Sequence, residues 1–500
     1  STFLSAQTTP IPDANFEAFL IAQGVDTNGT TGNILNSDAA GVTALNVNVN
    51  NITNFSGLQA FVNLVTLNLN GNQFATLPLT TLVDLEELRF NGNMILANLN
   101  LSANTKLRVF IARANGSINT APITSINLSA NTLLEDIDIY NFRNLANVTY
   151  PNTNTVRRIY MLLHANITVD FSGYDNLENL FLSTNFNNTF AINATLPNDQ
   201  NHLKSVSCQG GNIINVNVSN FLVLERLSLQ STNTETIQLP RTNTLRDIRI
   251  SGHKINTISF ENAPMLEILE INYKDGTSPT HTQIDITKNT QLKKFDANSN
   301  YMTSINVTQN TLLTDLDVSN NRLTVLDVTK NTVLKDLDAS RNQLPTINLA
   351  QNTLLERLNL SNNQLPNLNV TQNIGLTQLI INNNLFTGTG LDLTQNVNLN
   401  YLNASYNQIA SLNISQNRFL RNLILNHNRF SGTSIMDQYH AIQLAGGGLG
   451  YGQLDVSYNL LSGTIPDFAS IINHSYTRDF DLIFNDNSFH FGHFENPHAA

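Results

Sequence analysis

The sequence contains a single cysteine, Cys208, and no tryptophan among its 500 residues. One cysteine cannot form an internal disulfide, which argues against the cysteine-capped repeat domains typical of animal and plant extracellular proteins. We interpret Cys208 as a small buried hydrophobic residue. The sequence also lacks any run of 18 apolar residues. It therefore shows no transmembrane helix, and we predict no insertion into a membrane.

Charge is also scarce, because Asp, Glu, Lys and Arg together make up only 13% of the residues. The chain has 26 basic and 37 acidic residues, so its net charge is 26 − 37 = −11. An acidic balance disfavours nucleic acid and anionic membranes as partners. It leaves cations and basic surfaces as possible partners.

Asparagine is abundant where charged residues are scarce, with 80 copies. Apolar residues recur in the pattern L-x-x-L-x-L-x-x-N. The pattern begins at Val42 and occurs 18 times up to the copy at Leu420, mostly every 21 or 22 residues. Two looser copies start at Tyr451 and Asp479, so we count about 20 repeats. Such a period predicts a solenoid in which each repeat contacts its neighbours.

Positions one, four and six of each repeat alternate like a short strand that points inward. Stacked repeats would then pair these strands in parallel, about 4.8 Å apart. With about 21 residues per turn, little room remains for a full helix on the outer side. We therefore predict a mostly β solenoid of the α/β type with a parallel sheet on its concave face.

Position nine is asparagine in seven consecutive repeats. An apolar side chain there would leave buried backbone groups of the turn without partners, at roughly 1–3 kcal/mol each. Asparagine offers both donors and an acceptor, so we predict a structural ladder between neighbouring repeats. A second asparagine column follows ten residues later in most of these repeats, as in Asn310 and Asn331. The predicted ladder consists of Asn300, Asn321, Asn342, Asn363, Asn384, Asn407 and Asn428.

These repeats, which continue into segments such as "LDVTKNT", resemble leucine-rich repeats of the 21-residue internalin-like subclass over residues 42–490. The piece "LDVSYNLLSGTIPDF" is similar to the plant-type variant. The opening "IPDANFEAFLIAQGVDTNGT" is similar to N-terminal caps of secreted leucine-rich repeat proteins from Bacteroidetes-type bacteria. The resemblance implies a right-handed superhelix, partner binding or adhesion without catalysis, and a secreted or cell-surface location in a bacterium.

We expect four regions along the chain: a signal-peptide remnant at 1–6, an N-terminal cap at 7–41, the solenoid at 42–490 and a frayed or truncated end at 491–500. The cap should contain a short helix that starts after Asp13 and stops near Gly24. A helical insertion is expected near 434–444. Residues 26–30, "DTNGT", resemble a calcium loop only in part. They lack a glycine at the sixth position and a well-placed twelfth carboxylate, so we interpret them as an Asx-rich turn.

Strand positions three and five should point outward on the concave face, where two patches emerge. The first combines aromatic and aliphatic side chains with arginine, a composition typical of binding hot spots. Irregular insertions after Leu107 and Leu177 could instead cover it. This aromatic patch comprises Val109, Ile111, Arg158, Tyr160 and Phe181, with Tyr140 at its rim.

The second patch is acidic. Like charges on directly opposed strands destabilise a sheet, so the cluster indicates a site for a cation, with calcium as a candidate, or for a basic partner. The alternative is an acidic face that water simply solvates. Lys294 and Arg357 bracket it and offset part of the charge. The acidic patch comprises Asp296, Asp315, Asp317, Asp336 and Asp338.

No catalytic or zinc motif appears in the sequence, and we predict neither enzymatic activity nor a required cofactor. The leading hypothesis is a secreted or cell-surface recognition protein that binds a protein or glycan through its concave face, and we expect it to be a monomer. One alternative is the binding arm of a larger carbohydrate-processing enzyme or system whose catalytic domain lies outside this chain. Another is a structural spacer at the cell surface.

Overall fold

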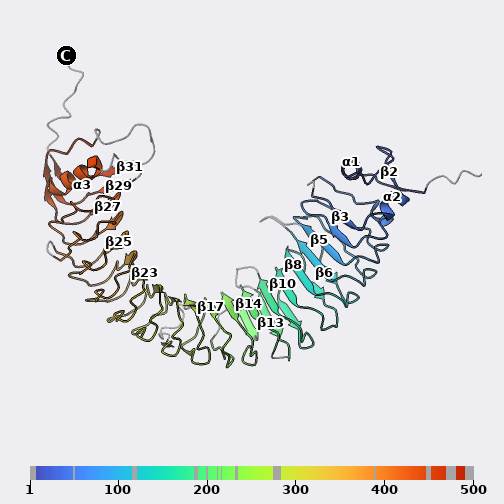
Figure 1. Ribbon diagram of the computed structural model, residues 1–500, viewed down its shortest axis with the longest axis horizontal. Helices are drawn as coiled ribbons and strands as arrows, with labels where there is room; N and C mark the ends of the chain where they lie inside the picture. Colours follow the sequence, from blue (N-terminus) through green and yellow to red (C-terminus); the bar gives the residue numbers. More distant parts are fainter. Residues whose placement is uncertain are drawn as a thin grey trace, which may run out of the picture. The chain divides into compact units, whose positions relative to one another are not determined.

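A computed structural model describes residues 7–48, 51–114, 121–184, 190–198, 201–210, 212–215, 217–230, 235–273, 283–387, 390–445, 452–468 and 480–489. The chain divides into two compact units, an N-terminal unit of Ser1–Leu245 and a C-terminal unit of Arg246–Ala500. Each unit is a solenoid of stacked turns (Figure 1). The predicted signal-peptide remnant at 1–6 and the predicted frayed end at 491–500 lie outside the described residues.

In the N-terminal unit, each turn contributes one strand to a parallel sheet, and each strand pairs with that of the next turn. Within its described residues these strands are β3 (Ala44–Asn46), β4 (Thr66–Asn68), β5 (Glu87–Asn91), β6 (Val109–Arg113), β8 (Asp136–Phe142), β10 (Arg158–Leu163), β12 (Asn179–Thr184), β14 (Ser205–Gln209) and β16 (Arg226–Gln230).

The C-terminal unit repeats this arrangement, again with parallel pairing between successive turns. Its described strands are β17 (Asp247–Ser251), β19 (Ile268–Asn272), β21 (Lys294–Asp296), β22 (Asp315–Asp317), β23 (Asp336–Asp338), β24 (Arg357–Asn359), β25 (Gln378–Ile380), β26 (Tyr401–Asn403), β27 (Asn422–Ile424), β29 (Gly452–Asp455) and β31 (Phe480–Ile483).

The remaining elements are short. Two strands near the N-terminus pair antiparallel, β1 (Thr8–Pro10) with β2 (Asn33–Leu35). The other short strands pair in parallel. Two pairs are β7 (Ser125–Asn127) with β9 (Asn147–Thr149) and β18 (Thr257–Ser259) with β20 (Gln283–Asp285). Two three-stranded sheets have the orders β11 (Ile167–Asp170), β13 (Ala191–Thr195), β15 (Asn212–Asn215) and β28 (Ser431–Gly432), β30 (Leu460–Gly463), β32 (Ser488–Phe489).

Helices are few, as the short repeat requires. The described helices are α1 (Ala14–Ala22), α2 (Asn36–Ala40), the 3₁₀ turn η1 (Leu58–Ala60) and α3 (Ser434–Ala445). Helix α1 begins after Asp13, whose carboxylate accepts the N–H groups of Asn15 and Phe16. Helix α3 occupies the position of the predicted insertion. In the described part of the chain, none of the helices has the length and apolar character needed to cross a bilayer.

The core follows from the repeat pattern. Leu313, Leu316 and Val318, at positions one, four and six of one repeat, are at most 2% exposed. Cys208 fills position six of its own repeat and is fully buried, which raises the pKa of its thiol to about 12. Because these inward positions recur from turn to turn, the stacked turns of each unit bury an apolar column. The prediction of a mostly β solenoid with a long parallel sheet is confirmed.

The predicted ladder asparagines lie just after the strands, and all are almost fully buried except Asn407, which is partly buried. The Nδ2 group of Asn321 donates to the carbonyl of Ala297 in the preceding repeat at 3.0 Å and to that of Val318 in its own repeat at 3.0 Å. Its Oδ1 accepts the N–H of Met302 in the preceding repeat at 2.9 Å. One carboxamide therefore satisfies backbone groups on two turns at once. Equivalent Nδ2 bonds to both turns occur at Asn300, Asn342, Asn363, Asn384, Asn407 and Asn428.

The second asparagine column is also internal. Asn331, for example, is fully buried, and its Nδ2 donates to the carbonyls of Val307 at 3.0 Å and Asn310 at 2.8 Å. Its Oδ1 is buried without a hydrogen-bond partner. These residues thus act as donors only, tying each turn to the preceding one on the side away from the sheet strands.

Strand length varies along the sheet. In the ladder repeats the residue before the asparagine adopts a left-handed conformation, as at Asn320 with φ 54° and Arg341 with φ 52°. In β21 to β27, where the ladder is continuous, each strand has three residues. In β8, β10 and β12 the ninth position is not a described ladder asparagine, and the strands extend to six or seven residues. The sheet is therefore widest around β8 to β12.

Aromatic side chains form the core at the beginning of the N-terminal unit. Five fully buried phenylalanines contact one another edge to face from α1 through successive turns, with ring centroids 5.1–6.2 Å apart. This geometry is favourable for aromatic pairs beyond the area that they bury. The series joins helix α1 to the first turns, and it consists of Phe16, Phe55, Phe74, Phe90 and Phe110.

Candidate recognition surface on the sheet

Three aromatic rings of the predicted patch contact one another on the open face of β8, β10 and β12. The rings of Tyr160 and Phe181 are stacked, with centroids 4.0 Å apart and planes 6° from parallel. Tyr140 lies 5.9 Å from Tyr160 in a tilted arrangement. This contact follows from register, because Tyr160 pairs directly with Phe181 across the sheet. All three side chains are partly exposed, so the stack presents a rigid apolar surface to solvent.

Arginines surround this stack, and carboxylates hold them in place. The guanidinium of Arg113 lies over the Tyr160 ring, 5.5 Å from its centroid, and forms a bidentate ion pair with Asp138. Arg158 pairs in the same way with Asp136, with Nε–Oδ1 at 2.8 Å. Hydrogen bonding to these carboxylates raises the pKa of both guanidinium groups. The arginines are thus fixed in one geometry while remaining exposed at their outer edge.

Two aliphatic members of the aromatic patch behave differently from the aromatic ones. Val109 is half-buried at the edge of the patch. Ile111 was predicted to face solvent, but it is only 6% exposed. It lies on the predicted side of the sheet, beside the longer side chains of Arg89 on the preceding strand and Arg113 on its own strand. A short branched side chain between longer neighbours cannot reach solvent, so the prediction for Ile111 is wrong.

The predicted aromatic patch did not include Arg113, because the prediction considered only positions three and five of each repeat and Arg113 occupies position seven. Position seven becomes part of the sheet only where the strand continues past position six, as in β6 and β8. The sequence carried no signal for this extension, because position nine of the β6 repeat is Asn115, as in the ladder repeats. Where the strand extends, position seven adds a further outward-facing row to the surface.

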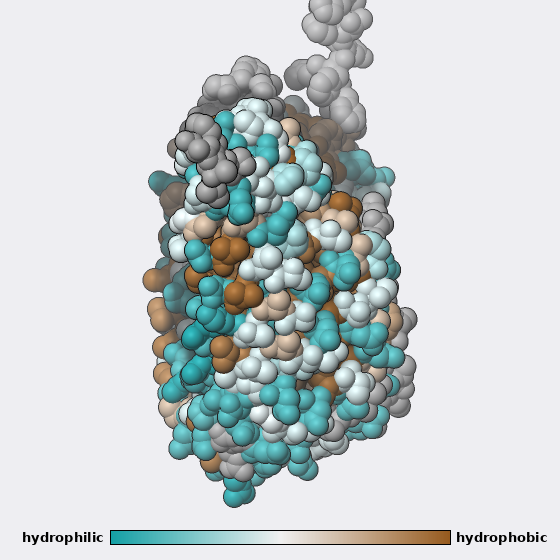
Figure 2. Space-filling model, turned by 90° about the vertical axis from the view of Figure 1, so that its right-hand side faces the viewer, coloured by the Kyte–Doolittle hydropathy of each residue, from teal (hydrophilic) through white to brown (hydrophobic). Residues whose placement is uncertain are grey.

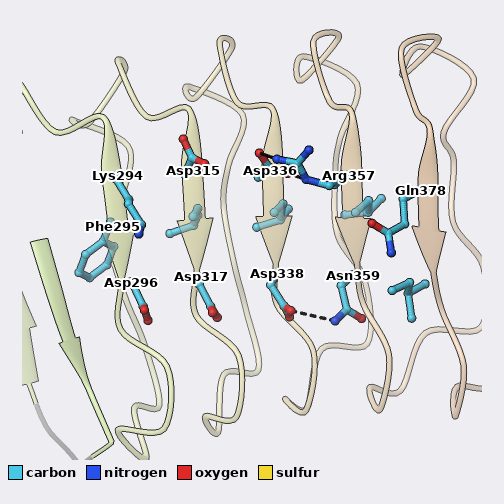
Figure 3. A pocket seen from close by; sticks show the side chains of 14 residues that line it. Lys294, Phe295, Asp296, Asp315, Asp317, Asp336, Asp338, Arg357, Asn359 and Gln378 are labelled. Atoms are coloured by element: carbon cyan, nitrogen blue, oxygen red, sulfur yellow. Dashed lines mark hydrogen bonds and ion pairs between the residues drawn. The ribbon is translucent and has the colours of Figure 1, made fainter. Parts of the chain in front are cut away.

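The acidic patch lines a cavity of about 390 Å³ on the open face of β21 to β25. Figure 3 shows two parallel rows on neighbouring strands, Asp296, Asp317 and Asp338 in one, and Lys294, Asp315, Asp336 and Arg357 in the other. Ion pairs and an amide hydrogen bond occur at the ends of these rows. Lys294 pairs with Glu270 at 2.7 Å, and Arg357 pairs with Asp336. The amide of Asn359 donates to Asp338 at 2.8 Å.

Asp317 occupies the centre of this acidic row. Its carboxylate accepts the N–H of Ser319 at 2.9 Å and lies between the carboxylates of Asp296 and Asp338. Burial, with a smaller contribution from these neighbouring charges, raises the pKa of Asp317 to about 6. All five aspartates are partly exposed, and burial also raises the pKa of Asp336.

The replacement Asp317→Asn is expected to stabilise the protein at pH 8 by about 1–2 kcal/mol and to leave its stability at pH 4 unchanged. A raised pKa means that folding favours the protonated carboxyl of Asp317. The stability that this protonated carboxyl contributes to the wild type is fully present below the unfolded pKa of 3.8 and is lost as the pH rises through about 6. Asn359 occupies the same position one strand beyond Asp338 and still accepts the N–H of Ser361, at 3.2 Å. Asparagine therefore fits this position.

Denaturant titrations at the two pH values measure this effect. The exposed Asp327, whose Oδ1 accepts the N–H of Thr329 at 3.0 Å, provides the matched control Asp327→Asn. An Asp317→Asn protein that is less stable than wild type at pH 8 would mean that the carboxylate is stabilised by its surroundings, contrary to the geometry.

A second row of rings was not anticipated from the sequence. Tyr406, His427 and Tyr458 stack at successive turns, with centroids 4.2 Å apart in both pairs. Each precedes a ladder asparagine and adopts the left-handed conformation, with φ of 50–55°. These rings occupy position eight, which is otherwise Asn, Ser or Arg in the described ladder repeats. The repeat pattern therefore predicts only a turn at this position. The two tyrosines are nearly half exposed.

On the face drawn in Figure 2, hydrophobic residues form small groups divided by hydrophilic ones. Within the described residues, no group of three or more His, Cys, Asp or Glu side chains is arranged to hold a metal ion. The aromatic patch therefore stands out because its rings contact one another and are flanked by fixed arginines.

Comparisons with known proteins support the fold. No protein-family model and no curated protein sequence matches the chain. Among solved structures, it is similar to the leucine-rich repeat ectodomain of the plant receptor kinase GASSHO1/SCHENGEN3 from Arabidopsis thaliana, at 18% identity over 90% of this chain and 59% of that one, with a TM-score of 0.55. A TDR receptor matches with a TM-score of 0.54, at 17% identity over 91% of this chain and 78% of that one.

A bacterial structure also matches, the functional domain of InlJ from Listeria monocytogenes, at 22% identity over 93% of this chain and 85% of that one, with a TM-score of 0.48. Identities of this size carry information on fold alone. Taken with the 21-residue period and the parallel sheet of each unit, the likeness in fold shows that the chain is a leucine-rich repeat protein.

Proposed function

We propose that this protein is a non-catalytic recognition protein, secreted or displayed on a bacterial cell surface, that binds a protein partner through the open face of its sheet. The observation that carries the proposal is the stack of Tyr140, Tyr160 and Phe181 beside the paired arginines Arg113 and Arg158. Aromatic and arginine side chains that are held rigid contribute most of the binding free energy at protein interfaces.

The composition of this surface favours a protein over a small ligand. The rings are stacked face to face, so they offer an apolar ridge and not a closed pocket. Each arginine already has a carboxylate partner, which leaves its remaining N–H groups for carbonyls or side chains of a partner. The solved structure of GASSHO1/SCHENGEN3 holds its ectodomain in complex with CASPARIAN STRIP INTEGRITY FACTOR 2, and that of PEPR1 is a complex with AtPEP1. These complexes support binding as a use of the fold.

The replacement Tyr160→Ala is expected to weaken partner binding by about tenfold to a hundredfold, because it removes the central ring of the stack and the surface under Arg113. Arrays of proteins and of glycans, probed with the purified chain, would identify the partner class. Surface plasmon resonance would then compare the affinities of wild type and variant.

Tyr406→Ala provides the matched control, since Tyr406 is an exposed and stacked ring outside the aromatic patch. Circular dichroism melting must show that both variants fold. Equal affinity of Tyr160→Ala and wild type for a protein partner would reject the patch as the binding site. A chain that binds only glycans would reject the partner class and would favour the carbohydrate-processing alternative.

A further inference from the structure

Two side-chain oxygens in the loop between α1 and α2 are buried and have no hydrogen-bond partner. They are Oδ2 of Asp26 and Oδ1 of Asn28. Asp26 is only 4% exposed. Buried polar atoms in folded proteins nearly always have a partner, so each exception calls for an explanation. A carboxylate and an amide oxygen that lie one residue apart and both lack donors are free to coordinate a cation.

The hydrogen bonds that these residues do make fix the direction of the free oxygens. Asn28 donates through Nδ2 to Oγ1 of Thr31 at 2.8 Å and to the carbonyl of Asn33 at 3.1 Å. Its Oδ1 must therefore point away from those acceptors. The other carboxylate oxygen of Asp26 accepts the N–H of Asn28 at 3.3 Å, which ties the two side chains together.

The loop carries more negative charge than its own contacts neutralise. Glu17 of α1 is 3% exposed, and its Oε1 accepts the N–H groups of Thr31 at 2.8 Å and Gly32 at 2.5 Å. Asp38 of α2 accepts the N–H of Thr27 at 3.0 Å. Burial first, and then the charges of Glu17 and Asp38, raise the pKa of Asp26. Three carboxylates thus face one short loop, with α1, β2 and α2 around it (Figure 1).

We propose that this loop binds a calcium ion through Oδ2 of Asp26 and Oδ1 of Asn28. Calcium prefers oxygen donors of mixed charge, including carboxylates, amide carbonyls, backbone carbonyls and water. The described residues include no group of three or more acidic, His or Cys side chains arranged to hold a metal. The site therefore relies on one carboxylate and one amide, with backbone oxygens and water completing it, while Glu17 and Asp38 supply longer-range attraction.

One sequence feature argues against a calcium loop. The sixth residue from Asp26 is Thr31, where calcium loops commonly have glycine. In the structure the backbone adopts a left-handed conformation at two nearby glycines, Gly29 with φ 74° and Gly32 with φ 73°. The acidic residue after β2, Asp38, lies on the following helix and bonds back to the loop at Thr27.

Isothermal titration calorimetry of the full chain with calcium chloride tests the site, after dialysis against EDTA and with magnesium chloride as the competing ion. We expect binding with a dissociation constant in the range of about 10⁻⁵ to 10⁻³ M, and a higher melting temperature in calcium than in EDTA. Asp26→Asn should raise the dissociation constant at least about tenfold. It should also raise the melting temperature in EDTA, because it removes an unpaired buried charge. Asn28→Asp should lower the dissociation constant by about tenfold, through its added charge.

Two control variants locate the ion. Asp327→Asn removes the carboxylate of an exposed turn, and Asp317→Asn alters the acidic patch. Both should bind calcium as the wild type does. The proposal is overturned if calcium gives neither heat nor a shift in melting temperature, if magnesium acts equally well, or if Asp317→Asn and not Asp26→Asn abolishes binding. The proposed recognition surface lies elsewhere in the chain, so failure of this test would leave the binding assay with Tyr160→Ala unaffected.

Discussion

Replacing Asn342 with alanine is expected to lower the free energy of unfolding by about 3–5 kcal/mol. The Nδ2 group of Asn342 donates to three buried carbonyls, those of Val318 at 3.0 Å, Ala339 at 3.1 Å and Ser340 at 3.1 Å. Its Oδ1 accepts the N–H of Leu323 at 2.9 Å. Alanine leaves the N–H of Leu323 without a partner inside the solenoid, at roughly 1–3 kcal/mol before the structure relaxes. It also removes one bond from each carbonyl, which costs roughly 0.5–1.5 kcal/mol per bond, although Val318, Ala339 and Ser340 each keep a second donor.

Asn369→Ala supplies the matched control, because its side chain is exposed and accepts one N–H, that of Thr371, at 3.1 Å. That change should cost about 1 kcal/mol or less. Urea denaturation followed by circular dichroism measures both variants. If Asn342→Ala cost no more than Asn369→Ala, the buried ladder would not be a main source of stability. Asn342→Asp should be at least as destabilising as alanine, since a carboxylate cannot donate to the three carbonyls.

The replacement Phe74→Ala should destabilise the N-terminal unit by about 3–5 kcal/mol. Phe74 is fully buried, and its ring contacts those of Phe55 and Phe90 edge to face, with both centroid distances at 5.4 Å. Alanine would leave a cavity between these two rings, and the cost of such a cavity remains because the surrounding structure relaxes only in part. The two lost ring pairs add roughly 0.5–1.5 kcal/mol each, which favours the upper part of that range.

Phe181→Ala is the corresponding control on the open face of the sheet. Its ring is partly exposed and stacks on Tyr160 alone among the described aromatic contacts, so its removal leaves no internal cavity. We expect a loss of about 1 kcal/mol or less, measured by the same denaturation experiment. A larger loss for Phe181→Ala than for Phe74→Ala would mean that the ring stack on the sheet is structural. It would then count against a role in recognition.

The two asparagine columns illustrate how a one-dimensional pattern can specify a three-dimensional contact. A polar residue at a fixed phase of a buried repeat needs partners inside, and the backbone of the adjacent turns is what lies within reach. Asn321 and Asn331 both satisfy that need, although with different numbers of bonds. The structure adds that Oδ1 of Asn331 has no partner, which the pattern did not indicate.

The open face was harder to predict from the same repeat. Positions three and five do point outward, and they correctly bring Tyr160 beside Phe181 and Asp317 between two other aspartates. Exposure, however, depends on the length of the neighbouring side chains, which is why Ile111 is buried. The strand length is a further unknown, because Arg113 joins the surface only where the strand continues through position seven.

The loop between α1 and α2 is another region where the sequence alone does not predict the side-chain contacts. Its sequence matches a calcium loop only in part and predicts an Asx-rich turn. The structure shows this turn, in which Oδ1 of Asp26 accepts the N–H of Asn28, and also shows that Oδ2 of Asp26 and Oδ1 of Asn28 have no partner. Hydrogen-bond satisfaction is a property of three-dimensional neighbours, and sequence spacing constrains it weakly.

By itself, the sequence determined the repeat, the inward positions, the parallel sheet and the place of the buried asparagines, because a period of about 21 residues forces each turn to stack on the next. Only the tertiary structure decided which outward side chains reach solvent, which rings stack, how far the pKa of Asp317 rises and which oxygens remain unpaired. Those properties depend on side-chain length, local strand extension and neighbouring charges across turns, and a linear period carries none of them.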